Sequence, residues 1–219
     1  MAEKKYTPMM QHYLKMKEEN PDAILFYRLG DFYEMFFEDA KLVSQELDLV
    51  LTGRSAGVEE KVPMCGVPFH AANSYIQRLV KKGYKVAICE QLEDPSSAKG
   101  LVDRGIIKII TPGTYMDATM DAKSTNYMAS CEISSFEITV IYCELSTGEL
   151  KYQTLQRSLV SLQKALLEQN VSELVCPMTM DKKWMAALEE MDAMVLILEP
   201  FVREIFISVY QDLQMMATI

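Results

Sequence analysis

A short apolar run at 23–27 precedes a glycine and then an aromatic and an acidic residue two positions apart, Phe32 and Glu34. The run predicts a buried strand, and Gly30 predicts a bend, because glycine accepts backbone angles that other residues avoid. Side chains alternate along a strand, so Phe32 and Glu34 are expected on one face and Tyr33 on the other. The order therefore predicts a strand, a bend and a second extended piece that can bring this pair to a surface.

An exposed ring beside a hydrogen-bonding group suits insertion into a stack of nucleic-acid bases. The ring unstacks a step while its polar neighbour reads the displaced base. The alternative is that Phe32 belongs to the core, where phenylalanine is most often found, and that Glu34 begins a helix. These residues alone leave both interpretations open.

The charge is acidic overall but uneven along the chain of 219 residues. There are 22 lysines and arginines against 31 aspartates and glutamates, a net charge of −9. Residues 1–120 hold 15 basic and 17 acidic side chains, whereas residues 121–219 hold 7 and 14. A phosphate-binding surface needs a local basic patch, not a basic total. Candidates for such a patch lie in the first half: Lys4, Lys5, Arg54, Lys61, Arg78, Lys81, Lys82 and Lys85.

The sequence gives no support for a membrane protein, a disulfide-bonded protein or a metal-binding protein. It contains no run of eighteen uncharged apolar residues, and its start lacks the apolar segment of a signal peptide. The five cysteines form no C-x-x-C pair, and His70 has no second ligand at metal-binding spacing. We therefore expect a soluble cytoplasmic protein with reduced thiols, no metal and no membrane partner.

Helix and strand signals alternate through residues 1–116. Thr7 is placed to cap a helix that Pro8 opens and that ends near residue 20. Apolar residues repeat at helical spacing in two further stretches: Phe36, Ala40, Val43 and Leu47, then Ala72, Tyr75, Ile76 and Leu79. Strands are predicted at 23–29, 32–34, 86–89 and 106–110, and a flexible loop at 52–57. This alternation predicts an α/β domain with a mixed sheet.

A polar stretch at 114–125 predicts a domain boundary. After it, residues 133–145 are expected to form strand material that a turn at 146–149 joins to a strand at 150–154. The following pattern predicts a helix at 158–169, a strand at 173–176, a helix at 181–191 and a strand at 194–198. Residues 201–219 are predicted to be helical.

Several short motifs occur in a fixed order along the first 117 residues. They are TPMMQ at 7–11, LFYRLGDFYE at 25–34, PMCGVPFH at 63–70, AICEQ at 87–91, DP at 94–95, KG at 99–100 and TPGT at 111–114. In this order and spacing the set resembles the amino-terminal part of the MutS family of DNA mismatch-recognition proteins. The resemblance is dense over 5–117 and thins to a pattern over about 124–198.

The resemblance implies an α/β fold in two domains. A mixed-sheet mismatch-recognition domain would span 1–116, and a linker would follow at 117–123. A ribonuclease H-like connector domain would span 124–200, followed by a divergent helical segment at 201–219.

The resemblance also implies roles for individual residues. Phe32 would stack against the mispaired base and Glu34 would hydrogen-bond to it. Mispaired steps unstack at low cost, so a protein that wedges and kinks DNA prefers them. Arg54 and Lys61 would lie near the duplex backbone and contact phosphates, unless they belong to a solvated mobile loop. No catalytic residue is implied.

The full-length family carries an ATP and Mg²⁺ site, dimer contacts and a DNA-encircling clamp further along the chain. The 219 residues contain no G-x-x-x-x-G-K-[ST] sequence. We therefore expect a MutS-like fragment without a cofactor or ATPase activity. Its expected partners are mismatched double-stranded DNA, further repair proteins that bind the connector and, in the full-length family, a second copy. A bacterial, nucleoid-associated location follows from the same resemblance.

Two other functions remain open. The chain is a candidate non-catalytic docking or regulatory module, in which the connector-like half binds repair proteins and the first half is inert. A ribonuclease H-like topology also suggests a nuclease, but two-metal nucleases need several converging carboxylates. The carboxylates available for such a site are few: Glu132, Glu137, Glu144 and Glu173.

Overall fold

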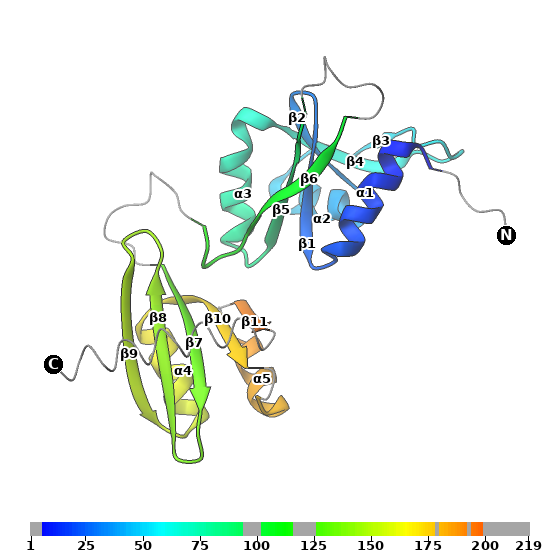
Figure 1. Cartoon of the computed structure of the whole chain (residues 1–219). Helices are drawn as coiled ribbons and strands as arrows, with labels where there is room; N and C mark the ends of the chain where they lie inside the picture. Colours follow the sequence, from blue (N-terminus) through cyan, green and yellow to red (C-terminus); the bar gives the residue numbers. More distant parts are fainter. Residues whose placement is uncertain (1–5, 94–101, 116–125, 178–179, 192–193, 199–219) are drawn as a thin grey trace. The chain divides into compact units, whose positions relative to one another are not determined.

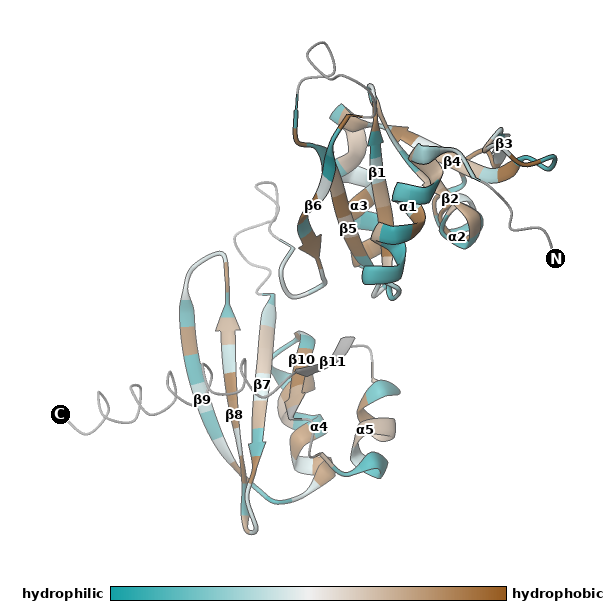
Figure 2. Cartoon of the chain, turned by 45° about the vertical axis from the view of Figure 1, so that its right-hand side comes forward, coloured by the Kyte–Doolittle hydropathy of each residue, from teal (hydrophilic) through white to brown (hydrophobic). Residues whose placement is uncertain are grey.

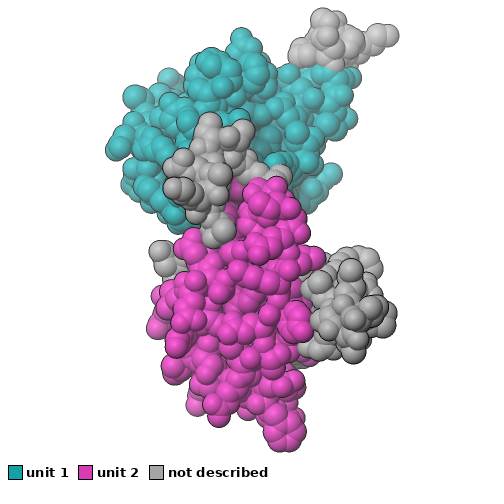
Figure 3. Space-filling model, turned by 90° about the vertical axis from the view of Figure 1, so that its left-hand side faces the viewer, with its two compact units in different colours: residues 1–111 teal, residues 112–219 magenta. Residues whose placement is uncertain are grey.

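The computed structural model describes residues 6–93, 102–115, 126–177, 180–191 and 194–198. Its contacts divide the chain into two compact units, residues 1–111 (unit 1) and residues 112–219 (unit 2) (Figure 3). The predicted linker at 117–123 and the predicted helical segment at 201–219 lie outside the described residues.

Unit 1 is a six-stranded mixed sheet with helices on both faces (Figure 1). Strands β1 and β5 pair in parallel, and the other neighbouring pairs are antiparallel. In sheet order the strands are β3 (Thr52–Arg54), β4 (Val62–Pro68), β2 (Phe32–Phe36), β1 (Ala23–Leu29), β5 (Lys85–Gln91) and β6 (Arg104–Ile110). The helices are α1 (Pro8–Glu19), α2 (Phe37–Leu47) and α3 (Ala72–Val80), with a short 3-10 turn η1 (Phe69–Ala71). The mixed α/β architecture expected from the sequence is confirmed.

Helix α1 packs on one face of this sheet. The Thr7 side chain caps it by accepting the Met10 N–H, and Pro8 opens its first turn, as predicted. The Tyr13 ring lies edge-on to the rings of Tyr27 and Phe36, with centroids 5.5 and 4.9 Å away. The exposed side of α1 is largely hydrophilic, whereas the strands carry apolar colours (Figure 2).

A buried carboxylate ties α1, β1 and α2 together. Strand β2 ends at Phe36, and Phe37 turns the chain into α2 with a φ of 53°. Beyond that point Asp39 accepts the backbone N–H of Leu25 at 2.9 Å and forms an ion pair with Lys17 at 2.9 Å. Because an unpaired buried N–H is costly, Asp39 replaces the strand partner that β2 no longer supplies.

Unit 2 is a five-stranded mixed sheet in which β7, β8 and β9 form an antiparallel meander and β10 and β11 add in parallel. Its strands are β7 (Tyr127–Ile133), β8 (Glu137–Glu144), β9 (Glu149–Gln156), β10 (Val171–Pro177) and β11 (Met194–Leu198). Its helices are α4 (Leu159–Glu168) and α5 (Lys182–Glu189). Leu162 and Leu166 of α4 and Leu188 of α5 pack into one core with the strands.

Three sequence predictions need correction. Residues 52–54 form strand β3 and not a loop, since they pair with β4. Phe36 closes strand β2 and does not begin the helix. The strand expected at 133–145 is confirmed only as β8, which begins at Glu137; it pairs with β7, a strand that was not predicted, across a turn in which the Ser134 hydroxyl accepts two backbone N–H groups.

Unit 1 is expected to fold on its own, because its sheet and both helical layers are complete within residues 6–111. A fragment of residues 1–118 should unfold in one cooperative transition on heating, measured by circular dichroism and calorimetry. A broad, non-cooperative transition would contradict this boundary.

His12 in α1 should make the stability of unit 1 depend on pH. Its Nδ1 lies 2.9 Å from the Tyr27 hydroxyl oxygen, and burial, followed by the positive charge of Arg104, lowers its pKa from the usual 6.5. The unfolded chain then binds more protons between the two pKa values. Stability should therefore be fully present above pH 6.5 and decrease as the pH falls through the lowered pKa. Urea unfolding at several pH values should show a smaller decrease for His12→Gln.

Candidate nucleic-acid interface

Phe32 lies at the surface, directly after the β1–β2 turn. Leu29 and Phe32 are register partners, so the turn contains two residues, Gly30 and Asp31. Gly30 has a φ of 58°, which suits a glycine at the first position of a tight hairpin turn. The Phe32 side chain is 46% exposed, whereas Phe36, on the same face of β2, is 1% exposed. The expected alternation is confirmed, since the Phe36 ring packs on Tyr13 of α1 whereas the Tyr33 ring packs on Phe26 on the other face.

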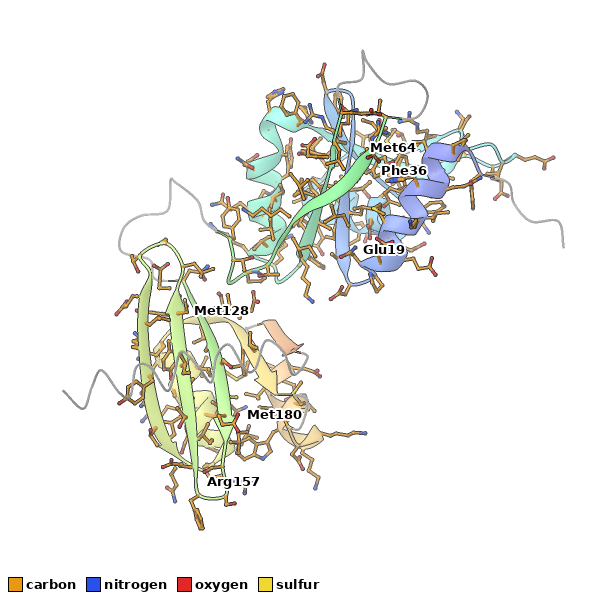
Figure 4. All side chains as sticks on the ribbon, viewed as in Figure 1. Glu19, Phe36, Met64, Met128, Arg157 and Met180 are labelled. Atoms are coloured by element: carbon orange, nitrogen blue, oxygen red, sulfur yellow. The ribbon has the colours of Figure 1, made fainter. Side chains whose placement is uncertain are left out.

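The difference between the two rings follows from where α1 lies. The helix covers the sheet at Tyr27 and Phe36, as Figure 4 shows for Phe36 beside its register partner Met64. Phe36 lies four residue steps along the strand from Phe32, roughly 13 Å. Phe36 is therefore part of the core, and Phe32 is available to a partner.

Glu34 lies on the same face as Phe32, between Tyr27 of β1 and Gly66 of β4. Its side chain is only 15% exposed. A Cβ added to Gly66 would lie 3.5 Å from Glu34 Cγ and 3.2 Å from the Tyr33 carbonyl oxygen. The missing side chain at Gly66 therefore leaves room for Glu34 to lie against the sheet.

Arg54 and Glu34 form an ion pair through Arg54 Nη1 and Glu34 Oε2. The Arg54 guanidinium also lies 6.0 Å from the centre of the Phe36 ring. The structure thus brings together two of the residues singled out in the sequence, although twenty positions separate them. Arg54 is already engaged by a carboxylate at the place where a phosphate contact was predicted.

Lys61 is exposed in the connection before β4, and its stem lies across Gly53. A Cβ added to Gly53 would stand 2.9 Å from Lys61 Cβ. The connection is anchored by Ala56, which is buried and accepts the Thr7 N–H at 2.8 Å. Lys61 therefore projects from a segment fixed against α1.

The expected basic patch is partly neutralised within unit 1. Lys82 pairs with Glu46 at 2.6 Å, Lys85 pairs with Asp22, and Arg54 pairs with Glu34. The two lysine pairs are surface pairs that contribute little to stability, whereas Glu34 is largely buried; all three pairs reduce the positive potential presented to phosphates.

Sequence reasoning missed a second exposed ring, Phe69, beside the same turn. Its side chain is 43% exposed, and its backbone N–H donates to the Asp31 carbonyl at 2.9 Å. The Arg28 guanidinium lies 3.7 Å from the centre of the Phe69 ring, within cation–π range. An aromatic residue directly after a strand that ends in Pro68 was the available signal.

Tyr33 and Glu90 support the turn from the other face of the sheet. The Tyr33 hydroxyl donates to the Glu90 carboxylate, which also pairs with Arg28 at 3.4 Å. Burial, and then the hydrogen bond to Glu90, raise the pKa of Tyr33 to about 12. The hairpin that carries Phe32 is therefore held by polar contacts as well as by strand pairing.

In unit 2, two of the carboxylates considered for a nuclease make structural hydrogen bonds. Glu144 accepts the Thr147 N–H at 2.7 Å and the Ser146 hydroxyl at 2.8 Å in the β8–β9 turn. The buried Glu173 accepts the Gly113 N–H at 2.9 Å. Within the described part of the chain, no three acidic, histidine or cysteine side chains gather in a way that would hold a metal. Nor is any described helix long and apolar enough to span a membrane.

Unit 1 is thus an α/β domain that presents an exposed ring and a carboxylate on one strand face. Residues 7–119 match the family model described as MutS domain I. The chain therefore belongs to the MutS family.

Curated relatives agree with this assignment. The DNA mismatch repair protein MutS of Clostridium botulinum (strain Loch Maree / Type A3) is 61% identical over 144 residues, which cover 65% of this chain and 16% of the relative. The protein of the same name from Clostridium tetani (strain Massachusetts / E88) is 58% identical over 146 residues, 66% of this chain and 17% of the relative. The chain thus matches about one sixth of the length of these relatives.

A solved structure, the simian T-cell lymphotropic virus intasome with the PP2A regulatory subunit B56 gamma, overlaps 38% of the chain and 38% of the matched chain. The TM-score is 0.27 and the sequence identity 13%. At that score the overlap supports no conclusion about the fold.

Substitutions of Phe32 and Phe36 test whether the first ring is exposed and the second is buried. Phe36→Ala should lower the free energy of unfolding by about 3–5 kcal/mol, because it empties a core position. Phe32→Ala should cost far less, since its ring is half in water. Urea unfolding of both variants measures the difference, and equal losses would contradict the exposed placement of Phe32.

Proposed function

We propose that the chain acts in DNA mismatch repair by binding mispaired double-stranded DNA through unit 1, with Phe32 entering the base stack. The observation that carries the proposal is the exposed Phe32 ring on the same strand face as Glu34, in a domain of the MutS family. Covering a half-exposed ring with a base removes apolar surface from water and so contributes to binding.

Selectivity arises from the cost of opening the stack. A wedge must separate neighbouring bases, and a mispaired step is separated more cheaply than a matched one. Glu34 then accepts a hydrogen bond from the displaced base, because a carboxylate has acceptors and no donor. A well-made contact to a base edge is worth about 1–3 kcal/mol of discrimination.

Phosphate contacts would hold the duplex in position without reading its sequence. Lys61 is a candidate, because it is exposed on a segment anchored to α1. We further propose that residues 124–200 act as the ribonuclease H-like connector, relaying the state of unit 1 to other repair proteins. The mixed sheet of unit 2, with helices α4 and α5 packed on it, is compatible with this role.

One observation favours protein docking by unit 2 as a second function. Phe136, in the turn between β7 and β8, is 87% exposed, and Leu150 and Tyr152 of β9 are also exposed. Exposed aromatic side chains are common anchors at protein interfaces. Docking by unit 2 is compatible with DNA binding by unit 1.

Phe32→Ala should remove the preference for mispaired DNA. Fluorescence anisotropy at low salt, with labelled duplexes containing a G·T or an A·T pair, should give a G·T-over-A·T affinity ratio close to one for this variant. Low salt keeps weak phosphate-driven binding measurable. Glu34→Ala should lower the same ratio and raise binding to the A·T duplex, because it removes a negative charge and leaves the positive charge of Arg54 unpaired near the phosphates.

Phe136→Ala is the matched control, since it also removes an exposed ring but from unit 2. It should keep the wild-type ratio. A Phe32→Ala protein that is folded and still prefers the G·T duplex would refute the wedge.

A further inference from the structure

The ion pair between Arg54 and Glu34 is set into the sheet and not held out in solvent. The Arg54 and Glu34 side chains are 36% and 15% exposed, respectively. Tyr27 and Gly66 flank Glu34 on the neighbouring strands, and the Phe36 ring lies 6.0 Å from the guanidinium. The carboxylate therefore has few orientations, and Arg54 contributes to selecting the one it adopts.

The pairing between β3 and β4, which places Arg54, is short. Strand β3 consists of three residues, and Arg54 stands opposite Val62 of β4, while Glu34 stands opposite Gly66. The two side chains meet across β4, and the missing side chain at Gly66 leaves room for Glu34 there. This geometry is built by the fold and does not depend on DNA.

The charges of Arg54 and Glu34 affect how unit 1 would bind DNA. An isolated carboxylate beside the wedge would repel the phosphates of an approaching duplex. A guanidinium paired with it cancels that charge while leaving the carboxylate able to accept further hydrogen bonds.

On this basis, and resting on the proposed function, we propose that Arg54 is a positioning residue that acts through Glu34. Its guanidinium orients the Glu34 carboxylate beside Phe32 for the mispaired base. It does not serve as an independent phosphate contact. Arg54 then determines discrimination between duplexes more than total affinity.

Replacing Arg54 with lysine distinguishes a residue that positions Glu34 from a residue that contacts phosphate. Lysine keeps the positive charge and binds phosphate well, but it lacks the planar group that fixes a carboxylate. Arg54→Lys should therefore lose most of the G·T-over-A·T ratio while binding the A·T duplex about as well as wild type, with an unchanged salt dependence. If Arg54→Lys keeps the wild-type ratio while Arg54→Gln weakens both duplexes equally, Arg54 is a phosphate contact and the proposal is wrong.

A double-mutant cycle tests whether Arg54 acts through Glu34. Arg54→Gln should lower the ratio in the wild-type background and leave it nearly unchanged in the Glu34→Gln background. Equal effects in both backgrounds would overturn the proposal. Lys82→Gln is the control, because it removes a cation of unit 1 that is paired with a different carboxylate, Glu46. It should not change the ratio.

A measurement without DNA separates failure of this proposal from failure of the proposed function. The ¹⁵N relaxation of the Arg54 Nε–H group in the 219-residue protein should report an ordered side chain that becomes mobile in Glu34→Gln. An Arg54 that is mobile in wild type overturns the positioning role, whatever the DNA result. A wild-type ratio of one refutes mismatch binding by this chain, and the positioning role with it. A ratio that Phe32→Ala abolishes but Arg54→Lys retains refutes positioning alone.

Discussion

A two-residue turn at Gly30 and Asp31 sets the register between β1 and β2, and the faces of β2 depend on that register. Because side chains alternate along a strand, a slip of one residue would expose Tyr33 and turn Phe32 and Glu34 toward the other face. The turn is held by the Arg28 Nε–H, which donates to the Gly30 carbonyl at 2.5 Å, and by the Phe69 N–H, which donates to Asp31. The candidate interface is therefore fixed by backbone geometry before any ligand binds.

The sheet that carries this turn is tied to its helices at the opposite end. Where β2 leaves the sheet, Asp39 satisfies the Leu25 N–H and pairs with Lys17, so that one buried carboxylate joins two helices to the central strand. Removing Lys17 would leave the buried Asp39 carboxylate without its counter-charge, which is unfavourable. A wedge needs this support, because the energy that opens a base stack must not be absorbed by deformation of the protein.

Local signals in the sequence predicted most of the fold. The elements that they missed depend on pairing between segments that are far apart in the sequence. The apolar run at 23–27, the cap at Thr7 and the alternation around Phe32 are local, and each was confirmed. Strand β3 carries no apolar alternation and exists only because β4 pairs with it. Strand β7 was missed because two of its inward positions hold the small residues Ala129 and Cys131, which weaken the apolar pattern. The Arg54–Glu34 pair depends on β3 and so could not be predicted from spacing.

The central claim is that Phe32 enters the base stack at the mispaired position. Photocrosslinking tests it directly, with 5-iodouracil placed at the mispaired position or several base pairs away in an otherwise identical duplex, followed by mass spectrometry of the crosslinked peptides. We predict a crosslink to Phe32 from the mispaired position and none from the distant one. Crosslinks that map to unit 2, or that reach Phe32 equally from both positions, would contradict the account.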